Sequence, residues 1–164
     1  MTLDHRPYKG DDAELICGFP RSAEELYLVF PKAAYPLNSK RWQEIAHARR
    51  DATVGLLDGR LAGYVDFVDV RENHYCTVGG LVVHPGYRRQ GVAGYLVNAM
   101  LQTAFDRYAA RFVRASCLSH NKPAFALFHK IGFRPAQMGQ RLGPDGEPFL
   151  LIHLHLLARN WKRP

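Results

Sequence analysis

The stretch LVVHPGYRRQGVAG, residues 81–94, joins an apolar run to the start of a helix. The run Leu81–Val83 predicts a buried strand, which the Pro85–Gly86 pair breaks. The small residues within Gly91–Gly94 let a ligand approach the backbone closely. Because the first N–H groups of a helix lack partners and its dipole favours negative charge, the stretch predicts a site for phosphate or pyrophosphate. The alternative is an ordinary connection with the surface arginines Arg88 and Arg89.

A second informative stretch, NKPAFALFHKIGF, covers residues 121–133. Asn121 is a good helix cap and Pro123 suits the first turn. Four apolar residues then fall on one helical face, which predicts an amphipathic helix: Ala124, Leu127, Phe128 and Ile131. Gly132 ends this helix and Phe133 begins a strand.

Together and in this order, the two stretches resemble the GNAT superfamily of acetyl-CoA-dependent N-acetyltransferases. The phosphate motif of that family, Arg/Gln-x-x-Gly-x-Gly/Ala, is matched by Arg88, Gly91 and Ala93. Its later motif, Asn-x-x-Ala-x-x-Leu-Tyr-x-Lys-x-Gly-Phe, is matched at Asn121, Ala124, Leu127, Lys130, Gly132 and Phe133. The resemblance extends over residues 53–133.

The resemblance implies an α/β fold: a mixed, mostly antiparallel central sheet of about seven strands flanked by about four helices, within one domain over residues 1–164. It implies acetyl-CoA as co-substrate and an amine acceptor that is a small molecule or a protein amine. Members of this family are often homodimers, so a homodimer is compatible with the resemblance. The residues expected to hold acetyl-CoA are Leu81, Val82, Val83, Arg88, Arg89, Gln90, Gly91, Val92, Ala93, Gly94, Asn121, Ala124 and Phe128.

The usual acid and base of the family are both missing. Phe128 stands where the family has a tyrosine acid, and Thr77 stands where some members have a glutamate base. The resemblance leaves the strand around Leu81–Val83 as the source of a backbone donor for the carbonyl oxygen. A water could relay the proton of the amine to one of three nearby groups, although each suits an ordinary turn or surface role: Glu72, His74 and His120. No catalytic side chain is assigned.

The flanking regions predict further elements. Asp58-Gly59 between apolar runs predicts a hairpin, and Gly79-Gly80 within the strand Tyr75–Val83 predicts a bulge. The stripe after Gly91 predicts a helix to about Tyr108. His153 and His155 share one face of a final strand, and without a third ligand they indicate a half-exposed face rather than a metal site.

Five aromatic residues in the early helices and loops have two interpretations. By resemblance they line an apolar acceptor pocket, and by composition they are core residues: Phe19, Tyr27, Phe30, Tyr35 and Trp42.

The composition limits the classes of partner and compartment that fit this chain. The net charge of +7 is dispersed, which suits a solvated surface plus a polyphosphate site better than nucleic acid or a membrane. The three cysteines are widely spaced and predict free thiols. The polar N-terminus lacks a signal-peptide core, so we expect a cytoplasmic protein.

Two other classes of function stay open. Phe128 and Thr77 favour a non-catalytic acyl-CoA-binding or sensing module, and the basic charge alone favours a nucleic-acid-binding domain. The acceptor is not readable from the sequence: a small amine, an amino acid, an antibiotic and a protein N-terminus all remain candidates.

Overall fold

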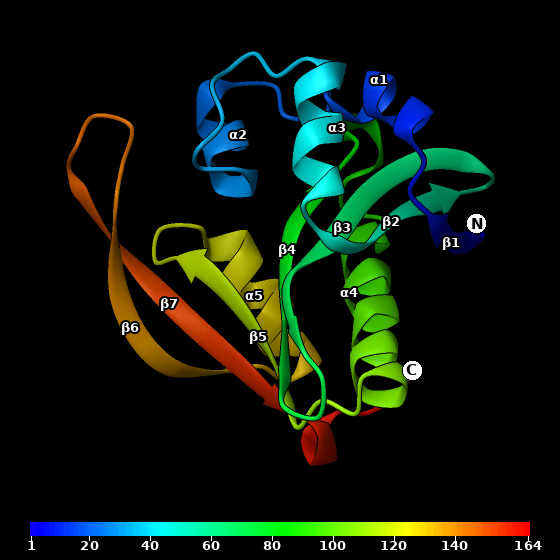
Figure 1. Cartoon of the computed structure of the whole chain (residues 1–164), viewed down its shortest axis with the longest axis vertical. Helices are drawn as coiled ribbons and strands as arrows, with labels where there is room; N and C mark the ends of the chain where they lie inside the picture. The colour runs from blue at the N-terminus through cyan, green and yellow to red at the C-terminus, as the bar shows by residue number, and fades with distance from the viewer.

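The computed structural model describes residues 1–164. Its central element is one seven-stranded sheet (Figure 1). The strand order is β1-β2-β3-β4-β5-β7-β6, and every neighbouring pair except β4–β5 is antiparallel. The expected mixed, mostly antiparallel sheet is therefore confirmed. The strands are β1 (Leu3–Pro7), β2 (Arg50–Leu57), β3 (Arg60–Arg71), β4 (Tyr75–Val83), β5 (Phe112–Leu118), β6 (Arg134–Leu142) and β7 (Pro148–Leu157).

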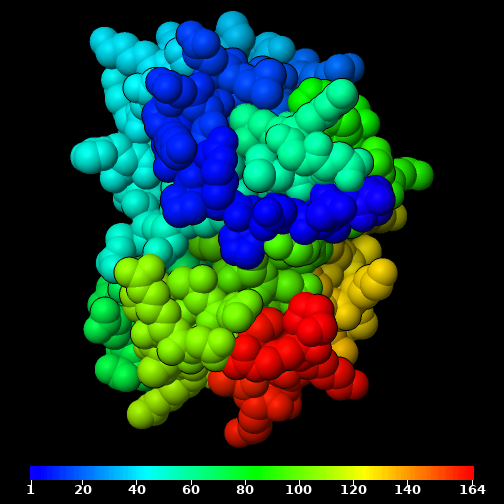
Figure 2. All heavy atoms as spheres, turned by 90° about the vertical axis from the view of Figure 1, so that its right-hand side faces the viewer, coloured from blue at the N-terminus to red at the C-terminus, as the bar shows by residue number.

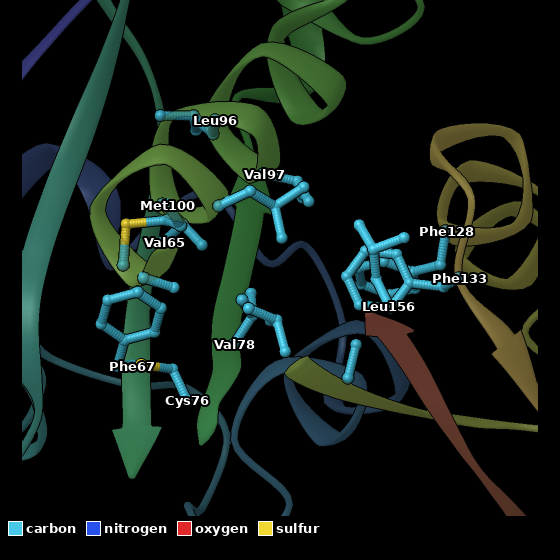
Figure 3. Close-up of a cluster of buried hydrophobic side chains, with 14 of the residues drawn as sticks. Val65, Phe67, Cys76, Val78, Leu96, Val97, Met100, Phe128, Phe133 and Leu156 are labelled. Carbon is cyan, nitrogen blue, oxygen red and sulfur yellow. The ribbon is translucent and has the colours of Figure 1, made fainter. Parts of the chain in front are cut away.

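Five α-helices cover the two faces of the sheet: α1 (Ala13–Ile16), α2 (Ala23–Val29), α3 (Ser39–His47), α4 (Val92–Gln102) and α5 (Lys122–Ile131). The first three bury their apolar residues against one face, around Tyr64 and Val82. α4 and α5 bury theirs against the other face, in a larger core that includes Phe67 and Leu156 (Figure 3). Ser22 and Asn38 cap α2 and α3, since each side chain accepts a backbone N–H of the first turn.

The apolar stripe of α4 is buried as predicted, with Leu96, Val97, Met100 and Leu101 at 1% exposure or less. The helix does not stay α-helical to Tyr108, because residues 103–107 widen into a π-helical turn. The C-terminal segment lies against α4 (Figure 2), where the Trp161 indole N–H donates to Asn98 Oδ1 at 3.0 Å.

The predicted hairpin between β2 and β3 turns at Asp58 and Gly59. Both residues have a left-handed backbone, with φ of 51° and 80°. This conformation matches the twist of a two-residue hairpin, which is why an Asp-Gly pair is so often found there.

The predicted bulge in β4 is also present. Tyr64 pairs with Val82 and Asp66 pairs with Gly79, so that β4 carries one residue more than β3 between these pairs. Gly80 has a φ of 65°, and a Cβ atom added there would lie 2.9 Å from Asp66 Oδ2. Only glycine fits this position without strain, because it has neither the side chain nor the preference for negative φ.

The three cysteines are free thiols, as expected, with Cys76 and Cys117 buried and Cys17 half-buried. Burial raises the pKa of the Cys76 thiol to about 11, which keeps it protonated and unreactive at neutral pH. No helix is long and apolar enough to cross a membrane.

The bulge gives a first prediction. Gly80→Ala combines a left-handed φ with a clash against Asp66 and should lower the free energy of unfolding by about 3 kcal/mol. Gly59→Ala has the same kind of φ but no neighbour within 4 Å, so it should cost only about 1 kcal/mol. Urea denaturation of both variants measures the difference. Equal losses would show that the Asp66 contact does not constrain the bulge.

Candidate active site

The split between β4 and β5 is the central feature of the site. The two strands pair in parallel over three residues only, from Tyr75–Phe112 to Thr77–Arg114, and then diverge (Figure 1). Beyond Thr77, the edge of β4 that faces β5 has no strand partner, and it includes the predicted residues Leu81–Val83. An unpaired strand edge can hydrogen-bond an extended ligand as an added strand would.

The predicted phosphate loop connects this edge to α4. None of the backbone N–H groups from Arg89 to Gly94 donates a hydrogen bond within the protein, and the first paired one is that of Tyr95. Arg89 and Gly91 both have left-handed backbones, with φ of 64° and 86°. Such turns place successive N–H groups along a concave backbone, and the dipole of α4 adds positive potential there. The loop therefore has the physical properties of an anion site.

The side chain of Arg88 has a partner that the sequence did not predict. Its guanidinium donates to Glu25 Oε1 of α2 at 2.8 Å, to the Val83 carbonyl at 3.3 Å and to the Phe19 carbonyl at 3.4 Å. The same ion pair lowers the pKa of Glu25. In this arrangement Arg88 links the end of β4 to α2, whereas Arg89 is exposed and forms no ion pair.

The later motif has one polar and one apolar part. Asn121 caps α5 by accepting the Ala124 N–H at 3.4 Å, which leaves its Nδ2 group without a partner. Phe128 is buried and packs edge-on against Phe133, with ring centroids 5.2 Å apart (Figure 3). The position where the family has its tyrosine therefore contributes to the core here and supplies no proton.

The other residues considered for proton transfer are spread out. Thr77 is the last residue of β4 that pairs with β5, and its Oγ1 accepts Arg114 Nε at 3.2 Å. Glu72 and His74 lie in the β3–β4 turn, at the closed end of the split. His120 is exposed between β5 and α5, beside the ring of Phe149. The structure does not gather these side chains into one group.

The aromatic residues of the early helices are mostly core. Phe19, Tyr27, Phe30 and Trp42 are at most 8% exposed, whereas Tyr35 is on the surface at 45%. Trp42 packs edge-on between the rings of Phe30 and Tyr64. Four of the five aromatic residues are therefore core residues, and they do not line an apolar pocket in this structure. The physical reason is that the short helices α1–α3 and the residues that connect them need large side chains to pack against the sheet.

A buried charged cluster lies beside the bulge. Asp66, with no exposed surface, accepts Arg49 Nη1 at 2.8 Å and the Tyr64 hydroxyl at 2.7 Å. Burial raises the pKa of Asp66 to about 6, although both hydrogen bonds act in the opposite direction. This cluster was not predicted from the sequence. The available signal was a single aspartate inside the apolar strand Tyr64–Phe67, since a buried charge requires partners.

Comparisons with known proteins identify the family and the fold. The family model described as the acetyltransferase (GNAT) family matches residues 19–133. A search of curated proteins gives no match.

Solved structures match over nearly the whole chain. A GNAT-family acetyltransferase from Bacillus anthracis superposes with a TM-score of 0.79 at 19% identity, over 96% of this chain and 95% of that one. A putative acetyltransferase from Salmonella typhimurium, solved with its cofactor acetyl-CoA, gives 0.74 at 18%, over 96% and 94%. Spermidine N-acetyltransferase from Vibrio cholerae, in complex with CoA and spermine, gives 0.81 at 15%, over 96% of both chains. At these identities the likeness establishes the fold.

The raised pKa of Asp66 gives a second prediction. Between about pH 4 and pH 6 the folded protein keeps a proton that the unfolded chain has lost, so this group destabilises the fold as the pH rises. Relative to Asp66→Asn, the wild type should lose about 2 kcal/mol of unfolding free energy from pH 4 to pH 7. Urea denaturation at several pH values measures it. A difference that stays flat or grows with pH would contradict the raised pKa.

Proposed function

The chain belongs to the acetyltransferase (GNAT) family, and we propose that it transfers an acetyl group from acetyl-CoA to a primary amine. The observation that carries this proposal is the succession of two sets of unpaired backbone groups, one along the free edge of β4 and one from Arg89 to the first turn of α4. CoA has the complementary form, with an extended amide-bearing arm attached to a pyrophosphate.

The proposed binding mode uses both sets of unpaired backbone groups. The unpaired N–H groups of Arg89–Gly94 hold the pyrophosphate at the start of α4. The edge of β4 at Leu81–Val83 pairs with the amides of the pantetheine arm. The free Nδ2 group of Asn121 donates to the same arm from the opposite side of the split. Two CoA-bound proteins of the same fold, from Salmonella typhimurium and Vibrio cholerae, support the choice of ligand.

The proposed chemistry is direct attack of the amine on the thioester. The carbonyl oxygen gains negative charge in the transition state, and a backbone N–H freed by the bulge near Gly80 stabilises it. The thiolate leaves with the electron pair of the C–S bond and needs no strong acid. Phe128 therefore does not rule out activity, and holding the two reactants in line supplies much of the rate.

The proposed acceptor is a class of compounds, the primary amines. The solved structures of this fold include proteins named for spermidine, for phosphinothricin and for an alanine of a ribosomal protein. This range includes small molecules and a residue of a protein, so it supports a primary amine and nothing narrower.

The alternative is a non-catalytic acyl-CoA-binding or sensing module. Its support is the pair of side chains at the expected acid and base positions, Phe128 and Thr77, neither of which is a general acid or base at neutral pH. Binding of acetyl-CoA without thiol release in the presence of any amine would favour it.

The test is acetyl-CoA turnover, measured as thiol release against a broad panel of amines, with Ala93→Asp beside the wild type. A carboxylate in the first turn stabilises a helix but repels a bound pyrophosphate. Ala93→Asp should therefore keep or raise the melting temperature while it weakens acetyl-CoA binding about 10-fold or more in calorimetry, which corresponds to 1.4 kcal/mol.

The matched control is Gln102→Glu, which adds the same charge at the other end of α4. It should leave acetyl-CoA binding unchanged. If Ala93→Asp binds acetyl-CoA as tightly as the wild type, the pyrophosphate does not lie at the start of α4. If the wild type neither binds nor turns over acetyl-CoA, the proposal is wrong.

A further inference from the structure

A polar strip on the sheet is unused by the proposed binding of acetyl-CoA. Alternate residues of β5 and β7 point into the core with α4 and α5, such as Ala115 and Leu154. The residues that alternate with these core residues point to the opposite face of the sheet. The four of them that form the polar strip are only half-buried. In Figure 1 α5 lies behind β5 and β7, and no helix covers their near face. The strip is Arg114, Ser116, His153 and His155.

Two of these side chains form a hydrogen-bonded pair. Ser116 and His153 lie directly opposite each other in the β5–β7 ladder, and Ser116 Oγ is 2.7 Å from His153 Nδ1. The other ring nitrogen of His153 has no hydrogen bond, and a Cβ on Gly139 of β6 would lie 3.6 Å from it. When the ring proton is on Nε2, Nδ1 accepts the serine proton, as in a hydrolase serine–histidine pair.

The register places this pair at the split. The last paired residues of the parallel strands, Thr77 and Arg114, have their side chains in contact on this face. Two residues further along each strand come Gly79, at the bulge of β4, and Ser116 on β5. Ser116 is therefore the first residue of β5 on this face that lies beyond the point of divergence, with the bulge on the other side of the split. His153 lies behind Ser116, one strand further from the bulge.

The charges around the pair keep the histidine neutral. Burial lowers the pKa of His153, and Arg114 of β5 and Arg141 of β6 lower it further. His155, its neighbour on the same face of β7, also has a lowered pKa, and its ring stacks on Phe112 at 4.5 Å. No carboxylate contributes to the shift of either histidine. A neutral imidazole at pH 7 is free to accept a proton.

We propose that Ser116 and His153 form the proton relay that deprotonates the acceptor amine during acetyl transfer. This inference rests on the proposed function. As the N–C bond forms, the amine gives a proton to Ser116 Oγ, and Ser116 gives its own proton to His153 Nδ1. The C–S bond breaks, the thiolate leaves with the electron pair, and it takes the proton from the relay. Ser116 and His153 return to their starting states.

The relay ends on an imidazole that can hold the proton, whereas Phe128 has no polar group and the Thr77 hydroxyl is hydrogen-bonded to Arg114, which cannot accept a proton. Ser116 touches the amine, so it is a catalytic residue, and His153 acts through it. Proton transfer by a positioned group contributes about 10² to 10⁴ in rate. Because the two residues act as a unit, losing either should cost about as much as losing both.

The test compares His153→Asn with His155→Asn, using the amine that the wild type acetylates best. Asn at position 153 can keep a hydrogen bond to Ser116 but cannot accept its proton. We expect kcat to fall about 100-fold in His153→Asn and in Ser116→Ala, and no further in the double variant. In the wild type, kcat/KM should fall at acidic pH with a pKa below 6.5, and His153→Asn should lose this limb. His155→Asn should retain the rate and the pH profile.

Calorimetry with acetyl-CoA separates the two proposals. All variants should bind acetyl-CoA as the wild type does, which also shows that they are folded. If the wild type turns over and His153→Asn keeps both its kcat and its acidic limb, the relay is wrong and the acetyltransferase proposal stands. Acetylation of Ser116 found by mass spectrometry would also overturn the relay, because serine would then be the nucleophile. A wild type without turnover with any amine contradicts both proposals.

Discussion

β4 and β5 hydrogen-bond over three residue pairs and then separate, and the arrangement of the site follows from this divergence. A parallel pair that continued to the strand ends would consume the backbone groups of Leu81–Val83. Because it stops, one side of β4 keeps unpaired donors and acceptors while the other side stays fixed to β3. The phosphate loop begins where this free edge ends, so an extended ligand meets strand edge and helix start in succession.

The bulge near Gly80 depends on charges buried beneath it. Asp66 lies where the side chain of residue 80 would be, and it is held by Arg49 and Tyr64. A charge without exposed surface is costly unless it is paired, so this cluster is maintained at the expense of stability. Since Arg49 begins the approach to β2 and its guanidinium lies over Phe30 at 5.2 Å, the cluster also connects the sheet to α2. We infer that the position of the proposed oxyanion donor is fixed by these contacts.

The features that were predictable from sequence are local ones. The Asp58-Gly59 hairpin, the Ser22 and Asn38 caps, the stripe of α4 and the bulge at Gly79-Gly80 each depend on a few neighbouring residues. The features that were not predictable depend on the register between distant strands. Ser116 and His153 are 37 residues apart, and Arg88 and Glu25 are 63 apart, so nothing in either stretch indicates the other. The aromatic residues in and around α1–α3 were predictable only in part. Their apolar character indicated burial, whereas the acceptor pocket that the resemblance implied is not lined by the four that are buried.

We infer that the free edge of β4 and the first turn of α4 together bind acetyl-CoA. A crystal structure of the protein with acetyl-CoA tests it most directly. We expect pantetheine amides hydrogen-bonded to the backbone of Leu81–Val83, the pyrophosphate on the N–H groups of Arg89–Gly94, and the thioester carbonyl at the bulge opposite Ser116. A complex in which the pyrophosphate lies away from α4, or in which the edge of β4 stays unpaired, would contradict it.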